Sequence, residues 1–194
     1  YAQDLIELIR RVEQRRSALL CAGKVAVGVA AYPTRHPESP SEAHDVEVLL
    51  AKQRSGADFA ITQVFFHTEQ YADLLTRARR AGVTIPIIPG VMPLTSIRRL
   101  TRLSELTGVE PAPELIERLA AADTDAERTR IGVSATVDLA NAALDAGAPG
   151  LHLYTFNEHA AALDVLDKLA LPRQRSGNRH RSHQRPAGRR QLAS

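Results

Sequence analysis

The sequence predicts an α/β fold built around a parallel sheet. Short runs rich in valine and isoleucine alternate with segments whose apolar residues recur at helical spacing. Strands separated by helices of ten or more residues need crossover connections, which make the strands parallel. About four strands are expected, half of what a closed (β/α)8 TIM-type barrel contains, and the GxGxxG fingerprint of doubly wound sheets follows none of them. We therefore expect an incomplete (β/α)8 barrel made of four βα units.

The expected elements follow one another regularly along the chain. Because each apolar run is short and uninterrupted, we expect strands buried on both faces, at residues 25–33, 58–66, 85–90 and 150–156. Helical spacing predicts helices at residues 1–16, 41–54, 68–80, 95–106, 114–121, 125–146 and 157–169. Ser41 and Thr68 are expected N-caps, and Gly56 stands where a helix end favours a left-handed residue.

Composition limits the possible classes of protein. The chain has 194 residues and a single cysteine, Cys21, which excludes an internal disulfide and a multi-cysteine metal cluster. No run of about 18 or more apolar residues could span a bilayer. We expect a soluble, cytoplasmic protein with no membrane partner and no metal site.

The positive charge is concentrated in the last segment, which has no acidic residue. Its arginines are Arg173, Arg175, Arg179, Arg181, Arg185, Arg189 and Arg190. Without these seven charges the net charge of +3 becomes −4, so the remaining chain has no general attraction to nucleic acid. Because the segment has almost no apolar residues to bury, we expect one folded domain at residues 1–171 and a disordered basic tail at residues 172–194. A nucleic-acid-binding tail remains an alternative, but we expect no nucleic-acid partner.

Polar and aromatic side chains follow the predicted strands at the edge where (β/α)8 barrels place their reactive groups. Tyr32, His36 and Glu38 follow the first strand, and Gln63 stands at the end of the second. A buried amide needs hydrogen-bond partners, so Gln63 suggests a polar partner such as a ligand ring.

Four strings extend this pattern: AAYPTRHPE, AITQVFF, IPIIPGVMP and HLYTFN. In this order and at this spacing they resemble the last four strand ends of the methylenetetrahydrofolate reductase family. The resemblance runs from Tyr1 to about Leu169 and implies the last four βα units of that barrel. It also implies FAD as cofactor, NAD(P)H as electron donor, and reduction of 5,10-methylenetetrahydrofolate to 5-methyltetrahydrofolate for methionine synthesis.

The resemblance assigns roles to individual residues. The residues matching flavin contacts of the family are Ala2, Tyr32, His36, Asp45 and Lys52. Gln63 matches the glutamine that hydrogen-bonds the pterin of the folate substrate.

The sequence also departs from the family pattern. Polar flavin-side positions are occupied by Val48 and Ala51, and positions near folate by Arg99, Leu103 and Glu158. Glu158 stands where an arginine is usual, so we expect weaker binding of an anionic substrate.

No residue of this sequence matches the family's proton donor, a glutamate at the end of the first barrel strand. We therefore assign no catalytic residue, and expect a partner that completes the barrel, either another copy or a separate N-terminal half. The alternative function is a catalytically incomplete fragment or a partner subunit that lacks the proton donor.

Overall fold

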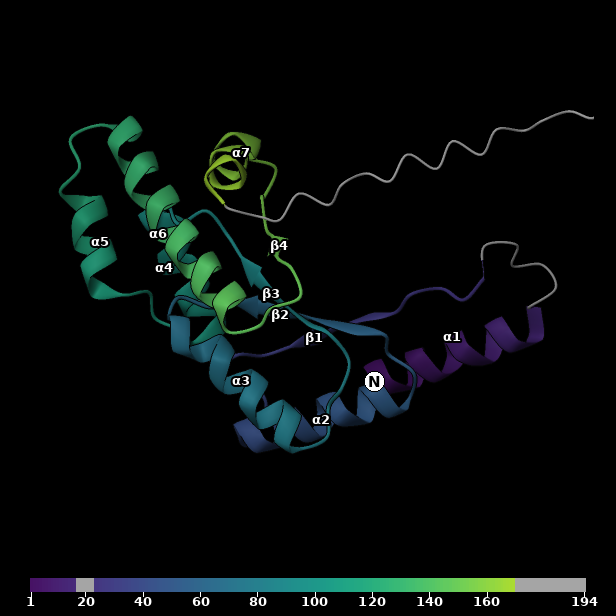
Figure 1. The fold of residues 1–194 in the computed structure, drawn as a ribbon. Coiled ribbons are helices and arrows are strands. Elements are labelled where there is room, and N and C mark those ends of the chain that lie inside the picture. Colours follow the sequence, from purple (N-terminus) through teal and green to yellow (C-terminus); the bar gives the residue numbers. More distant parts are fainter. Residues whose placement is uncertain (17–22, 170–194) are drawn as a thin grey trace, which may run out of the picture.

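A computed structural model describes residues 1–16 and 23–169 (Figure 1). The elements in this part of the chain are α1 (Ala2–Arg16), β1 (Gly28–Ala31), α2 (Glu42–Arg54), β2 (Phe59–Val64), α3 (Thr68–Arg80), β3 (Ile87–Val91), α4 (Ile97–Thr107), α5 (Pro113–Ala120), α6 (Asp125–Asp145), β4 (His152–Leu153) and α7 (His159–Lys168). All four predicted strands and all seven predicted helices are present. The predicted basic tail, residues 172–194, and Cys21 lie outside the described residues.

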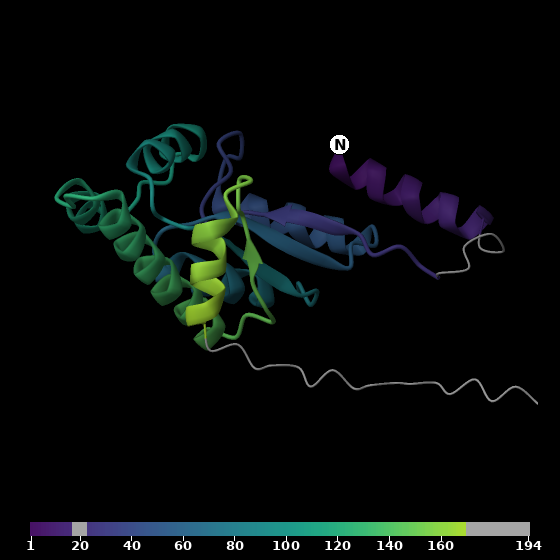
Figure 2. The same ribbon diagram turned by 90° about the horizontal axis from the view of Figure 1, so that it is seen from above.

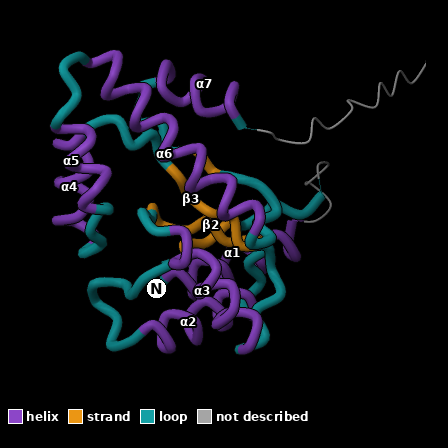
Figure 3. Tube along the Cα trace, turned by 60° about the vertical axis from the view of Figure 1, so that its left-hand side comes forward, coloured by secondary structure: helices purple, strands orange, loops and turns teal. Residues whose placement is uncertain are grey.

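The four strands form one parallel sheet in the order β1-β2-β3-β4. Each connection moves to the next strand in the same direction, and because parallel crossovers are right-handed, the helices of the three crossovers belong on one face. The contacts agree: α1 touches α2, α2 touches α3, α3 touches α6, and α6 touches α7. In Figure 3, α6 and α7 lie above β3, and α2 and α3 lie below β2.

Only one face of this sheet is fully covered, so the prediction of strands buried on both faces is wrong. Along β2, Ala60, Thr62 and Val64 are buried, whereas the alternating Phe59, Ile61 and Gln63 are half-buried. β1 is an edge strand, and its Gly28 and Ala30 are exposed. The physical reason is the unreversed strand order, which leaves the second face without helices in the described part of the chain.

The ends of the helices follow local chemistry. The Ser41 hydroxyl accepts from the His44 amide at 3.1 Å, so the predicted N-cap of α2 is confirmed. The prediction of Thr68 as an N-cap is wrong, because His67 is the N-cap of α3. The last helix begins at His159 rather than near residue 157, because two preceding residues, Phe156 and Asn157, have positive φ values of 50° and 65°.

The sheet is irregular at the carboxyl end of β2. Val64 lies three positions after Ile61 on β2, whereas their partners on β3, Ile88 and Gly90, lie two positions apart, so β2 contains a β-bulge. Side chains satisfy the backbone groups that the bulge releases: Thr62 Oγ1 accepts from the Gly90 amide at 2.8 Å, and Tyr154 Oη donates to Thr62 O at 3.1 Å. The bulge therefore links three strands at the edge where the candidate site residues lie.

Helix α1 lies at the margin of the fold, beyond β1 and far from α4 to α6 (Figure 2). Its predicted apolar face is only partly used, because Ile6 is buried while Leu5, Leu8 and Val12 are exposed. Ile6 packs with Val27 and other residues in a small cluster separate from the main core. Among the described residues, no helix is long and apolar enough to cross a membrane.

Candidate functional site

A cavity of about 430 Å³ opens at the carboxyl end of β1. Its walls are the first turn of α1, the end of β1, the loop that follows, and one face of α2. All five residues that the sequence predicts for cofactor binding line it, and they are Ala2, Tyr32, His36, Asp45 and Lys52. Pockets of about 300–1,000 Å³ commonly bind small molecules and cofactors. The fold therefore brings together residues that are up to 50 positions apart in the sequence.

Tyr32, His36 and Asp45 form one connected group. The rings of Tyr32 and His36 meet edge to face, with centroids 4.6 Å apart. The Asp45 carboxylate accepts from the His36 amide at 2.9 Å, and His36 Nδ1 accepts from the Glu38 amide at 3.1 Å. Because Nδ1 is an acceptor, a proton on the other ring nitrogen, Nε2, can be donated to a ligand.

Burial raises the pKa of Tyr32, and the nearby carboxylates of Asp45 and Glu38 raise it further. The phenol therefore remains a hydrogen-bond donor throughout the physiological pH range. The second carboxylate oxygen of Asp45 has no hydrogen-bond partner among the described residues, so it can accept from a ligand hydroxyl.

Lys52 contributes a cation to the cavity. Its Nζ donates to the carbonyl of Ala30 at 3.0 Å, one of the three hydrogen bonds that an ammonium can make. Burial lowers the pKa of Lys52, and Asp45 partly opposes this shift. A half-buried ammonium with donors to spare suits an anionic ligand group.

Ala2 contributes main chain rather than a side chain. It is the first residue of α1, where backbone amides lack partners within the helix, and helix N-termini favour anions for this reason. Val48, one of the departures from the family pattern, also lines the cavity and is 37% exposed. Val48 therefore joins Leu49 and Leu74 in the apolar part of the cavity wall.

Gln63 does not line this cavity. Ala31 pairs with Thr62, so Tyr32 and Gln63 follow at adjacent positions of neighbouring strands. The side-chain oxygen of Gln63 accepts from the Val64 amide at 2.9 Å, within the β-bulge. The argument that a buried amide requires a ligand is therefore weaker than the sequence suggested, because the side chain is half-buried and its oxygen has a partner within the protein.

Arg99 and Glu158, treated as separate departures in the sequence, form an ion pair with 2.5 Å between Arg99 Nη2 and Glu158 Oε1. The Arg99 guanidinium also lies 5.4 Å from the centre of the exposed Phe156 ring. The hydrogen bond and charge of Arg99 lower the pKa of Glu158. The acidic residue thus has its own cation, which a single sequence could not reveal because the two positions are 59 residues apart.

Tyr154 was not predicted as a site residue. It reaches from the end of β4 to the bulge, stacks on Phe156 with centroids 6.3 Å apart, and meets His152 edge to face. Burial raises its pKa, and Tyr32 adds to the shift. The alternation of aromatic residues in HLYTF was the available signal, because His152, Tyr154 and Phe156 occur at a spacing of two.

The described residues thus form an α/β protein with a parallel four-stranded sheet, whose candidate site lies at the carboxyl edge. The family model for methylenetetrahydrofolate reductase matches residues 1–170. The chain belongs to the methylenetetrahydrofolate reductase family, a family of oxidoreductases whose barrels are of the TIM type.

Over the aligned residues, several relatives are about one-third identical to this chain. Methylenetetrahydrofolate reductase 2 of Saccharomyces cerevisiae is 34% identical over 185 residues, which cover 93% of this chain and 30% of that protein. The 5,10-methylenetetrahydrofolate reductase of Escherichia coli is 32% identical over 158 residues, covering 81% of this chain and 50% of that protein. A probable methylenetetrahydrofolate reductase (NADPH) of Caenorhabditis elegans is 34% identical over 148 residues, which cover 75% of this chain and 22% of that protein. The chain spans half or less of the length of these relatives.

A solved structure supports the fold. An uncharacterized protein from Clostridium thermocellum that binds two copies of 5-methyl-5,6,7,8-tetrahydrofolic acid superimposes with a TM-score of 0.51 over 74% of this chain and 53% of that one. The two sequences are 20% identical, so this comparison concerns the fold alone.

Proposed function

We propose that this chain forms the FAD-binding half of a methylenetetrahydrofolate reductase, which reduces 5,10-methylenetetrahydrofolate to 5-methyltetrahydrofolate with NAD(P)H. One observation supports this most strongly: five residues assigned to FAD by the family resemblance converge on one cavity. The relatives' names, and the folate bound by the Clostridium thermocellum protein, support a folate substrate.

The residues of the cavity fit part of FAD. Lys52 and the free amides at the start of α1 suit its diphosphate, and the unpaired oxygen of Asp45 suits a hydroxyl of its sugar or ribityl chain. Tyr32 and His36 offer an aromatic surface and ring donors beside them. When bound, FAD would supply the hydride-transfer chemistry of the reaction.

Gln63 is proposed to orient the pterin ring of the substrate. Its oxygen is occupied by the Val64 amide, which leaves its amino group as the donor available to a ligand. Because that hydrogen bond fixes the side-chain amide, Gln63 would present its donor in one orientation.

We further propose that the four strands are half of a (β/α)8 barrel. The unreversed strand order and the single helical layer support this, because a doubly wound sheet has helices on both faces. The half-buried face with Phe59, Ile61 and Gln63 would become the barrel interior once four more strands, from additional chain or a second polypeptide, close the sheet.

A second proposal follows from the absence of a residue that matches the family's proton donor. The chain by itself would then be catalytically incomplete, and would act as a partner for the segment that supplies the acid. Both proposals assign the same role to the cavity, and they differ in whether this sequence alone turns over substrate.

A titration of the purified chain with FAD, followed by flavin fluorescence, tests the proposal with and without a separately expressed N-terminal half from a full-length relative. We expect stoichiometric FAD and reductase activity only in the mixture. No FAD binding in either sample would contradict the assignment of the cavity, and full activity of the chain alone would contradict the need for a second half. Glu114→Ala is the control, and we expect it to bind FAD as wild type because Glu114 is exposed and does not line the cavity.

A further inference from the structure

One wall of the candidate FAD cavity is formed by a helix that few apolar contacts hold in place. Tyr1, Ala2, Gln3 and Asp4 of α1 line the cavity. Of the apolar residues of α1, only Ile6 is buried, and the small cluster around it is separate from the main core. The position of this wall therefore depends on polar contacts farther along α1.

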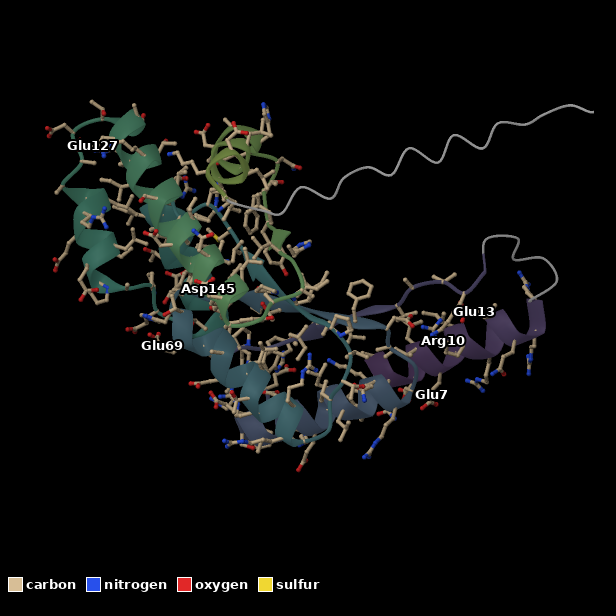
Figure 4. The ribbon with its side chains drawn as sticks, in the orientation of Figure 1. Glu7, Arg10, Glu13, Glu69, Glu127 and Asp145 are labelled. Carbon is tan, nitrogen blue, oxygen red and sulfur yellow. The ribbon has the colours of Figure 1, made fainter. Side chains whose placement is uncertain are left out.

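Arg10 provides most of these contacts, and Ser55 Oγ adds one by donating to the Glu7 carboxylate at 3.1 Å. Its Nε and Nη2 donate to the carbonyl of Gly56 at 3.0 and 2.6 Å, and Nη2 also donates to Asp58. Its Nη1 donates to the Glu13 carboxylate at 2.7 Å and to the Val25 carbonyl at 2.8 Å. One guanidinium thus joins α1 to the segment before β1 and to the turn between α2 and β2. Figure 4 labels Arg10 and Glu13 on α1.

The partners of Arg10 are themselves fixed. Asp58 accepts from Lys24 Nζ at 2.6 Å and from the Val27 amide at 2.8 Å, and Glu13 accepts from the Val25 amide. Two cations and two carboxylates balance in charge, and the side chain of Arg10 is 14% exposed. The group is therefore a connected network rather than a set of separate surface pairs.

Gly56 makes room for this arrangement. Its φ of 107° is strained for other residues, and an added Cβ would lie 3.0 Å from Arg10 Nε. The turn is thus shaped so that its carbonyl receives two donors from a helix 46 residues earlier.

We propose that Arg10 is a positioning residue for the FAD cavity: by fixing α1 against the amino-terminal side of β1 and β2, it sets the place of the wall that residues 1–4 form. Arg10 lies eight positions after Ala2, about 12 Å along the helix, and does not line the cavity. This inference rests on the proposed function for the identity of the ligand, and on the contacts of Arg10 for the rest.

The test compares Arg10→Met and Arg10→Lys with Arg11→Met, a matched control in which the neighbouring arginine is exposed. FAD affinity is measured by fluorescence in the mixture with an N-terminal half, and hydrogen exchange of α1 and α3 amides is measured in the chain alone. Arg10→Met loses several charge-assisted hydrogen bonds, so we expect about 10-fold weaker FAD binding. We also expect faster exchange in α1 and unchanged exchange in α3, whereas Arg11→Met behaves as wild type. Arg10→Lys keeps the charge but cannot donate to all the acceptors, so its FAD affinity should fall between those of wild type and Arg10→Met.

Three results would overturn the inference. Wild-type FAD affinity in Arg10→Met would show that the wall does not depend on Arg10. Equal loosening of α1 and α3 would show a general structural role instead of a positioning role. Absence of FAD binding by the wild-type mixture would overturn the proposed function, and with it the role of Arg10. This result differs from failure of the Arg10 inference alone, because it occurs in the protein without any substitution.

Discussion

Gly90 lies where two other segments approach the backbone of β3 closely. A Cβ at this position would clash with the Thr62 carbonyl oxygen and would lie 2.6 Å from Tyr154 Cε2. Thr62 belongs to the β-bulge, and its hydroxyl already accepts from the Gly90 amide. Because the carbonyl is backbone, it cannot move without disturbing the bulge, so Gly90→Ala should displace Tyr154 and strain the sheet.

The free-energy cost of overpacking by Gly90→Ala should exceed the stabilisation that alanine provides through the unfolded chain. Overpacking of a dense interior costs about 1–3 kcal/mol, whereas replacing glycine by alanine stabilises by about 0.4–1 kcal/mol through the unfolded chain where no strain arises. The net loss is about 1–2 kcal/mol, which corresponds to a fall in Tm of roughly 2–8 °C for a domain of this size. Thermal unfolding followed by circular dichroism measures it directly.

Gly150→Ala is the matched control, because no atom lies within 4 Å of an added Cβ there. We expect its Tm to stay within about 1–2 °C of wild type, since surface changes are usually within ±0.5 kcal/mol. Equal melting temperatures for Gly90→Ala and Gly150→Ala would refute the argument that close approach of Thr62 and Tyr154 requires glycine.

Three further predictions concern charged groups. Lys52→Met keeps the aliphatic stem but removes the cation, so we expect about 10-fold weaker FAD binding in the mixture with an N-terminal half; unchanged affinity would exclude a contact. Arg99→Glu should loosen the loop that precedes α7, and the double exchange with Glu158→Arg should restore it, as measured by hydrogen exchange of amides 154–158; no rescue would mean that the pair does not form. Hydrogen bonds from Lys24, the Val27 amide and Arg10 lower the pKa of Asp58 from 3.8 to about 2. Its contribution to stability is therefore complete above pH 3.8 and lost as pH falls towards about 2. Asp58→Asn should abolish this acid step in a circular-dichroism titration.

The elements of the fold were predictable because their signals are local. The apolar runs and the helical spacing placed every strand and helix, and Ser41 identified the start of α2 by its own hydrogen bond. The wrong predictions concern features that depend on neighbouring parts of the fold. The start of α7 depends on two positive-φ residues in a loop. The half-buried face of β2 depends on which side the helices cover, which short apolar runs do not specify.

The candidate site was predictable in part. Motif resemblance identified Tyr32, His36, Asp45 and Lys52, and these do share a cavity. The partnership of Arg99 with Glu158 was not predictable, nor was the contact of Tyr154 with the bulge, because each joins residues distant in sequence.

By itself the sequence determined the class of fold, the order of its elements, and the types of side chain available at the strand ends. Only the tertiary structure decided which of those side chains meet, how the bulge satisfies its backbone groups, and how one arginine of α1 holds the cavity wall. The physical reason is the range of the forces involved. Helix and strand formation follow from periodicities of a few residues, whereas hydrogen bonds and ion pairs across the fold depend on distances that exist only once the chain has folded.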